Sequence, residues 1–123
     1  MNNQKHFGIW MDNRQATVVG NENGADTGFT VVGHVKGEAS APNSSEKTSN
    51  NHEKSLQQKF FKEVASHIVN ATNVHITGTG QAQEQFIRYL ADTPQFKGVK
   101  TTESTSNKMS DEKLIEYISG KFS

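Results

Sequence analysis

Two periodicities divide the chain. Short stretches in which apolar residues adjoin or alternate predict strands at residues 7–12, 16–20, 28–35, 73–77 and 98–103. Apolar residues spaced three and four positions apart predict helices at residues 55–71, at residues 82–93 before Pro94, and after Ser110. Ser110 is a typical N-cap, and Asp111 and Glu112 suit the positively polarised first turn of the last helix.

The order of these elements, β-β-β-α-β-α-β-α, predicts a fold class. Three consecutive strands favour an antiparallel meander, while strands that follow helical crossovers join a sheet in parallel with right-handed connections. We therefore expect a single α/β domain with three layers, in which helices cover the faces of a mixed five-stranded sheet. This arrangement is ribonuclease-H-like.

The segment from Gly37 to Lys54 differs from the rest of the chain. It consists mainly of Ser, Asn, Glu and Lys, with one proline, Pro42, and no large apolar residue. Such a sequence buries too little surface to offset the entropy of ordering it. We expect a mobile polar loop at residues 37–54 within one domain of residues 1–123, either simply disordered or functional.

Composition narrows the classes of function. The chain has 13 basic and 13 acidic residues, so its net charge is zero, and it has no cysteine. Neutral charge argues against general nucleic-acid binding but allows a local basic patch. Without cysteine there is no disulfide, thiolate nucleophile or Cys-based zinc site. The polar N-terminus and the lack of a long apolar run predict a cytoplasmic protein that does not enter a membrane.

Three stretches resemble a family of short, mostly uncharacterised bacterial proteins. Residues 8–16, GIWMDNRQA, resemble its opening "G-I-W-hydrophobic-D-H-R-K-A". Residues 76–83, ITGTGQAQ, resemble its "hydrophobic-x-G-P-G-E-A-K" loop, and residues 103–111 resemble its "E-T-x-D-K-M-T-D" segment. That family is similar in fold to the central domain of eukaryotic and archaeal peptide-chain release factors, and is grouped with translational-machinery components.

Departures from the family pattern limit what the resemblance implies. In release factors the loop after the third strand carries a Gly-Gly-Gln tripeptide that promotes peptidyl-tRNA hydrolysis. The corresponding segment here, residues 37–54, contains no Gly-Gly-Gln, so the resemblance does not imply peptide release. Thr79, Gln81 and Gln83 replace the proline, the acid and the lysine of the family's glycine loop. The resemblance therefore implies the fold more than the function.

The glycine loop is the first candidate site. Gly78, Thr79, Gly80 and Gln81 lie between a predicted strand and the start of a predicted helix. Backbone N–H groups and the helix dipole at such a place favour an anion. The alternative is that the glycines only make a tight turn and let the helix pack closely. The loop is neither a Walker loop nor a dinucleotide fingerprint.

Basic residues form the second candidate site. Arg14, Lys97, Lys100 and Lys108, together with Arg88, are candidates for a modest patch that contacts RNA or a protein partner. The alternative is a scatter of surface charges with no common role.

No catalytic residue, metal site or cofactor is predicted. The five histidines show no i, i+4 pair, with His67 expected beside the core and His75 on the side of its strand opposite Val74 and Ile76. Asp12, Asp26 and Glu103 are the carboxylates that a ribonuclease-H-type nuclease would need at strand ends, although Asp12 is explained more simply as a turn residue.

Three hypotheses of function remain. The leading one is a non-enzymatic accessory or binding protein with a release-factor-like domain that associates with the ribosome or RNA. The second is a protein-interaction module, such as a homodimer that uses an exposed sheet edge or the region of Phe96. The third is a protein that binds a small anion or phosphate at the Gly78–Gly80 turn.

Overall fold

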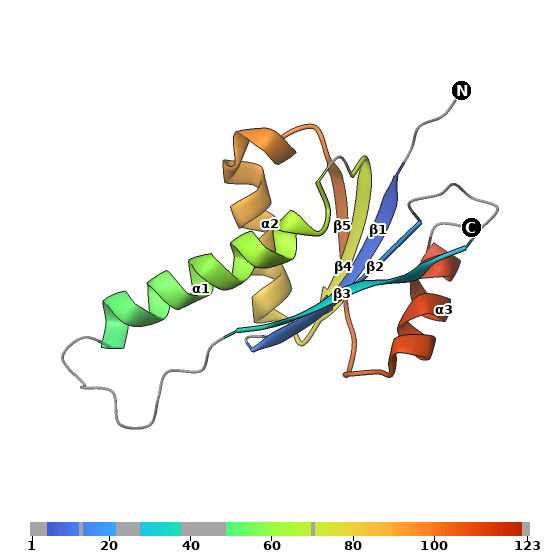
Figure 1. The fold of residues 1–123 in the computed structure, drawn as a ribbon, viewed down its shortest axis with the longest axis horizontal. Coiled ribbons are helices and arrows are strands. Elements are labelled where there is room, and N and C mark those ends of the chain that lie inside the picture. Colours follow the sequence, from blue (N-terminus) through green and yellow to red (C-terminus); the bar gives the residue numbers. More distant parts are fainter. Residues whose placement is uncertain (1–4, 13, 22–27, 38–48, 70, 122–123) are drawn as a thin grey trace.

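The computed structural model describes residues 5–12, 14–21, 28–37, 49–69 and 71–121. Its five strands are β1 (His6–Met11), β2 (Gln15–Asn21), β3 (Thr30–Lys36), β4 (Asn73–Gly78) and β5 (Lys100–Thr105). They form one sheet in the order β3-β2-β1-β4-β5 (Figure 1). β2 is antiparallel to β1 and β3, whereas β4 is parallel to β1 and β5. The predicted mixed sheet is confirmed.

Helices cover both faces of this sheet. They are α1 (Ser49–Ser66), α2 (Gln81–Asp92) and α3 (Asp111–Lys121), and a short 3-10 turn, η3 (Pro94–Phe96), follows α2. α1 and α2 lie on one face and α3 lies on the other, so the three-layer α/β architecture is confirmed (Figure 1).

The bounds of α1 differ from the prediction. The helix begins at Ser49, so residues 49–54 of the expected loop are helical, while residues 38–48 lie outside the described part of the chain. Once a helix is anchored, each further residue adds a hydrogen bond, so a helix can extend through residues that have no apolar face. Apolar periodicity therefore detects only the anchored part.

The end of α1 also differs, because the helix stops at Ser66 rather than at residue 71. The N–H groups of His67 and Ile68 bond to the carbonyls three residues earlier, at 3.1 and 3.0 Å, which tightens the chain into a turn. Ile68 and Ala71 are nevertheless buried. Their spacing reports burial correctly, although the backbone there is no longer helical.

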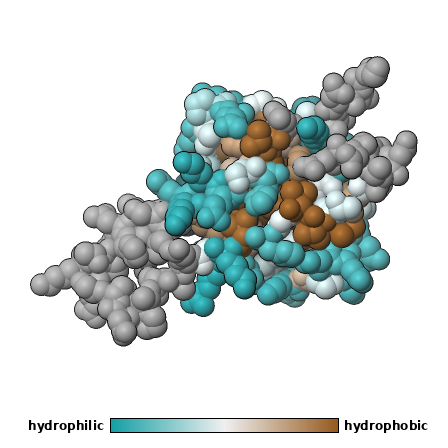
Figure 2. All heavy atoms as spheres, in the orientation of Figure 1, coloured by the Kyte–Doolittle hydropathy of each residue, from teal (hydrophilic) through white to brown (hydrophobic). Residues whose placement is uncertain are grey.

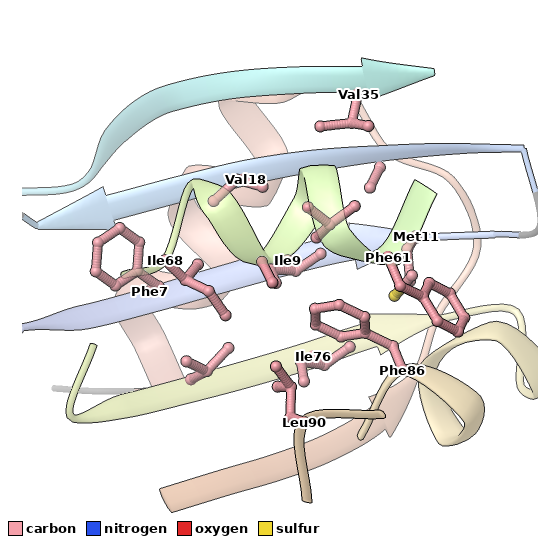
Figure 3. Close-up of a cluster of buried hydrophobic side chains, with 14 of the residues drawn as sticks. Phe7, Ile9, Met11, Val18, Val35, Phe61, Ile68, Ile76, Phe86 and Leu90 are labelled. Carbon is pink, nitrogen blue, oxygen red and sulfur yellow. The ribbon is translucent and has the colours of Figure 1, made fainter. Parts of the chain in front are cut away.

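The main core lies between the sheet and the helices α1 and α2. Alternate residues of β1, namely Phe7, Ile9 and Met11, point to this face, as Figure 3 shows. They pack with side chains from β2, β4, α1 and α2, including Val18, Ile76, Phe61, Phe86 and Leu90.

A smaller core lies between the sheet and α3. It contains Trp10, Val19, Leu114 and Ile118. Gly8 lets α3 approach β1, because a Cβ at this position would collide with the side chain of Ile118.

The start of α3 follows the sequence signals. The backbone N–H of Lys113 donates to Ser110 Oγ at 3.3 Å, so the predicted N-cap is confirmed. Met109 packs against the same small core as Leu114, as expected for residues on either side of an N-cap.

Candidate functional site

One edge of the sheet gathers most of the predicted site residues. β1, β3, β4 and β5 run in the same direction, so their C-terminal ends lie at a common edge together with the start of β2. We call this the carboxyl edge. It carries Arg14, Lys36, the Gly78–Gln81 turn and Lys108.

Arg14 and Lys36 are neighbours on this edge. The carboxylate of Asp12 accepts the N–H groups of Arg14 and Gln15 at 2.7 and 2.8 Å, which confirms the turn role of Asp12. Gln15 lies opposite Lys36 in the β2–β3 register, and the Gly37 N–H donates to the Arg14 carbonyl at 2.6 Å. Arg14 and Lys36 are both exposed, so both cations face solvent at this edge.

Of the predicted basic residues, Arg14, Lys97, Lys100 and Lys108 do not form one patch. Lys108 follows β5 and lies towards the carboxyl edge with Arg14, whereas Lys100 begins β5 and Lys97 precedes it. A six-residue strand is about 20 Å long, which separates the two pairs. The sequence shows the charges but not which ends of the strands meet. All four side chains are exposed.

Close packing accounts for Gly78. A Cβ on Gly78 would collide with the carbonyl oxygen of Met11, because β4 lies directly beside β1 at this point. Gly80 has φ 128°, a conformation that favours glycine, and it caps α2. The turn therefore has a structural reason for both glycines, and anion binding at Gly78, Thr79, Gly80 and Gln81 stays a prediction.

Gln83 ties this turn to the sheet. Its side chain is 1% exposed, and its Oε1 accepts the Gly80 N–H at 2.8 Å. Its Nε2 donates to the carbonyl of Ser104 in β5 at 3.0 Å. One of the N–H groups that would face an anion is thus engaged inside the protein. Thr79 and Gln81 are exposed.

A polar network lies on the α3 side of β4 and β5. His75 Nδ1 is 2.7 Å from Thr102 Oγ1, and its Nε2 is 2.9 Å from Ser104 Oγ. Ser104 also hydrogen-bonds Thr77 at 2.9 Å and the Tyr117 hydroxyl at 2.6 Å. The network therefore joins β4 and β5 to α3.

The charges of this network follow from its surroundings. Burial lowers the pKa of His75, and the positive charge of Lys121 lowers it further. For Tyr117, burial raises the pKa, but hydrogen bonds to Ser104 and Thr77 and the charge of Lys121 together lower it. Lys121 Nζ lies 5.2 Å from the centre of the Tyr117 ring. A neutral imidazole is thus held among hydroxyl groups.

Sequence reasoning found only part of this network. The expected side of His75, opposite Val74 and Ile76, is confirmed, and His67 is half-buried. The alternation of His75 with Thr77, and of Thr102 with Ser104, is the signal that indicates two facing polar rows. Their pairing depends on the β4–β5 register, which places His75 opposite Thr102.

Trp10 presents a buried N–H on the same side of the sheet. Trp10 is 3% exposed and lies beside Thr77 in the β1–β4 register. Its indole Nε1 has no hydrogen-bond partner among the described residues. Its ring packs with Val19, Leu114 and Ile118, so the burial of this ring holds α3 on the sheet.

Other predicted features are not brought together. Glu103 is exposed on an edge strand, and Asp26 lies outside the described residues. No cluster of three His, Asp or Glu side chains suited to a metal ion occurs in the described part of the chain. Phe96 is 6% exposed and packs in the main core, so its side chain does not face solvent, and an interface in the region of Phe96 stays a prediction. None of the described helices has the length and hydrophobicity needed to cross a bilayer.

Comparison with known proteins identifies the fold. No family model matches the chain, and no curated protein matches its sequence. Solved structures that are similar to it include the Pelota protein of Thermoplasma acidophilum, with a TM-score of 0.63 and 21% identity over 95% of this chain.

Two further structures agree with this result. The Pelota protein of Archaeoglobus fulgidus has a TM-score of 0.64 and 12% identity over 98% of this chain. The archaeal translation termination factor aRF1 has a TM-score of 0.60 and 14% identity, also over 98% of this chain. The chain spans about a third of the length of these proteins: 33% of the Thermoplasma Pelota protein, 32% of the Archaeoglobus Pelota protein and 35% of aRF1. It therefore has the fold of one domain of Pelota and archaeal release-factor proteins.

Proposed function

We propose that this chain is a non-enzymatic accessory protein that associates with the ribosome or with RNA. The observation that carries the proposal is the similarity of almost the whole chain to one domain of Pelota proteins and of an archaeal translation termination factor. The fold alone does not define an activity. The proposal therefore also needs a surface that would suit RNA.

The carboxyl edge is the surface that favours RNA contact. Arg14 and Lys36 lie on neighbouring strand ends and are exposed there, and Lys108 is exposed in the segment after β5. Cations on a rigid sheet edge suit a phosphate backbone, which dominates the affinity of most nucleic-acid contacts. Because the net charge of the chain is zero, such contact would be local and sensitive to salt.

Peptide release is not part of the proposal. The connection between β3 and α1 has no Gly-Gly-Gln, and the buried Gln83 stands where the resembling family has a lysine. Gln83 is engaged with Gly80 and Ser104 and so supports the turn instead of facing a ligand.

Co-sedimentation with ribosomes at low and high salt tests the proposal. Wild-type protein should travel with a ribosomal peak at low salt and be released at high salt. The variant Arg14→Glu/Lys36→Glu should lose this association. The matched control Lys97→Glu/Lys100→Glu makes the same change of charge at the opposite edge and should retain it. Wild-type protein that stays at the top of the gradient at both salt concentrations would contradict the proposal.

Phosphate binding at the Gly78–Gln81 turn is the second candidate. The exposed Thr79 and Gln81 at the start of α2, on the same edge as Arg14, favour it. A ligand that binds only the native state raises its apparent stability. A panel of nucleotides and inorganic phosphate should then raise the melting temperature, and the absence of any shift would count against the site.

A further inference from the structure

The two outer strands of the sheet differ in how well they are protected. β5 carries Lys100 and Glu103 among small hydroxyl residues, and four of its six side chains are exposed. In β3, Val31, Val32 and Val35 surround Gly33, and no acidic residue or lysine occurs between Thr30 and Val35. Charged side chains on an edge strand oppose pairing with another chain. β5 therefore carries a charge inside the strand as well as at its start, whereas the lysine of β3, Lys36, lies at the strand's end.

Hydrophobic side chains accompany the open edge of β3. Val31 and Phe29 pack half-buried against the small core, together with Ile115 of α3, whereas Val32 packs against the main core. Figure 2, in which β3 lies at the front, shows hydrophobic patches between hydrophilic side chains in this part of the surface. β3 ends the sheet, so no strand among the described residues covers its outer side.

We propose that the outer edge of β3 is the interface between two copies of this chain, which join their sheets through an antiparallel β3–β3 pair. This inference is independent of the proposed function. In a dimer with a two-fold axis, the open apolar edge of β3 in one copy pairs with the same edge in the other copy, so the interface is self-complementary. The added strand would reduce the exposure of Phe29, Val31 and Ile115 in both copies.

Charge favours a second copy in the antiparallel orientation. The net charge of the chain is zero, so two copies do not repel each other strongly. Lys36 lies at the C-terminal end of β3, and antiparallel pairing keeps the two Lys36 side chains apart, whereas parallel pairing would bring them together. Asp111 of α3 is already in contact with His34 of β3, with His34 Nε2 3.0 Å from Asp111 Oδ2.

Amide hydrogen exchange at increasing concentrations of the full chain tests the proposal directly. The outward-facing amides of β3 should become protected as the sedimentation mass rises from one copy to two, while the outward-facing amides of β5 should exchange at an unchanged rate. A single-copy mass up to millimolar concentration would overturn the proposal. So would protection confined to β5.

Two matched variants locate the interface. Val31→Lys places a cation on the half-buried side of β3 and should weaken dimerisation at least about tenfold. Thr101→Lys makes the same change at a half-buried position of β5 and should leave dimerisation unchanged within about twofold. Thermal unfolding verifies that both variants fold. If Val31→Lys fails to fold, the exposed Thr30→Lys replaces it, and equal effects of the β3 and β5 variants would overturn the proposal.

Discussion

On the face of the sheet covered by α1 and α2, apolar side chains from four strands and two helices pack together. On the opposite face, covered by α3, a small apolar core lies beside a row of hydroxyl groups and an imidazole. The first face is stabilised by burial of apolar surface, which is non-directional and tolerates small changes in side-chain position. The second depends on a close glycine contact and on specific hydrogen bonds. We infer that the first face contributes most of the stability and that the second determines how α3 is placed.

The largest expected effect tests the main core. Phe86 is fully buried and its ring lies 5.4 Å from that of Phe61 in an edge-to-face arrangement. Phe86→Ala should lower the free energy of unfolding by about 3–5 kcal/mol, because it leaves a cavity. Chemical denaturation measures this value. Ile115→Ala, at a half-buried position on the α3 face, should cost only about 1 kcal/mol, and equal losses would contradict the comparison.

A smaller effect tests the approach of α3 to the sheet. Gly8→Ala should lower the free energy of unfolding by about 1–3 kcal/mol, because the new methyl group meets Ile118. Gly98→Ala is the control, since a Cβ there has no neighbour within 4 Å. If both alanines have the same effect in thermal unfolding, α3 does not depend on close contact at Gly8.

Removing a hydroxyl group from the polar network should change the free energy of unfolding by a similar or smaller amount. Ser104→Ala removes a shared partner of His75, Thr77 and Tyr117 and should cost about 1–3 kcal/mol, because buried polar groups lose their hydrogen bonds. Ser66→Ala, on an exposed helix end, should change stability by less than about 0.5 kcal/mol. If Ser104→Ala leaves the free energy of unfolding unchanged, water replaces the lost hydroxyl group.

The smallest expected effect is a dependence of stability on pH. Burial and Lys121 lower the pKa of His75 below its ordinary 6.5, so the unfolded chain binds a proton more readily than the folded protein. The contribution of neutral His75 is complete above that value and is lost as pH falls below it. His75→Asn should therefore show a shallower loss of stability than wild type between about pH 7 and about pH 5. Parallel curves from denaturation at each pH would contradict this.

Local sequence signals predicted the strands and helices of this protein and which of their residues are buried. The signals were the short apolar run at residues 7–12, the alternation at residues 73–77, the helical spacing of Val64 and Ile68, and the Ser110 N-cap. They report interactions between near neighbours in the chain. These depend on backbone geometry and apolar periodicity, which the sequence shows directly. The fold class and the strand directions followed from the order of elements and from the handedness of crossovers.

Only the tertiary structure decided which distant residues meet. The β4–β5 register placed His75 between Thr102 and Ser104, and the common direction of four strands divided the basic residues between two edges. Gln83 reads as an exposed polar residue in the sequence but is buried between Gly80 and Ser104. The contacts of His75 with Thr102 and of Gln83 with Ser104 join residues more than twenty positions apart. No periodicity records them, because register and packing are properties of the assembled sheet.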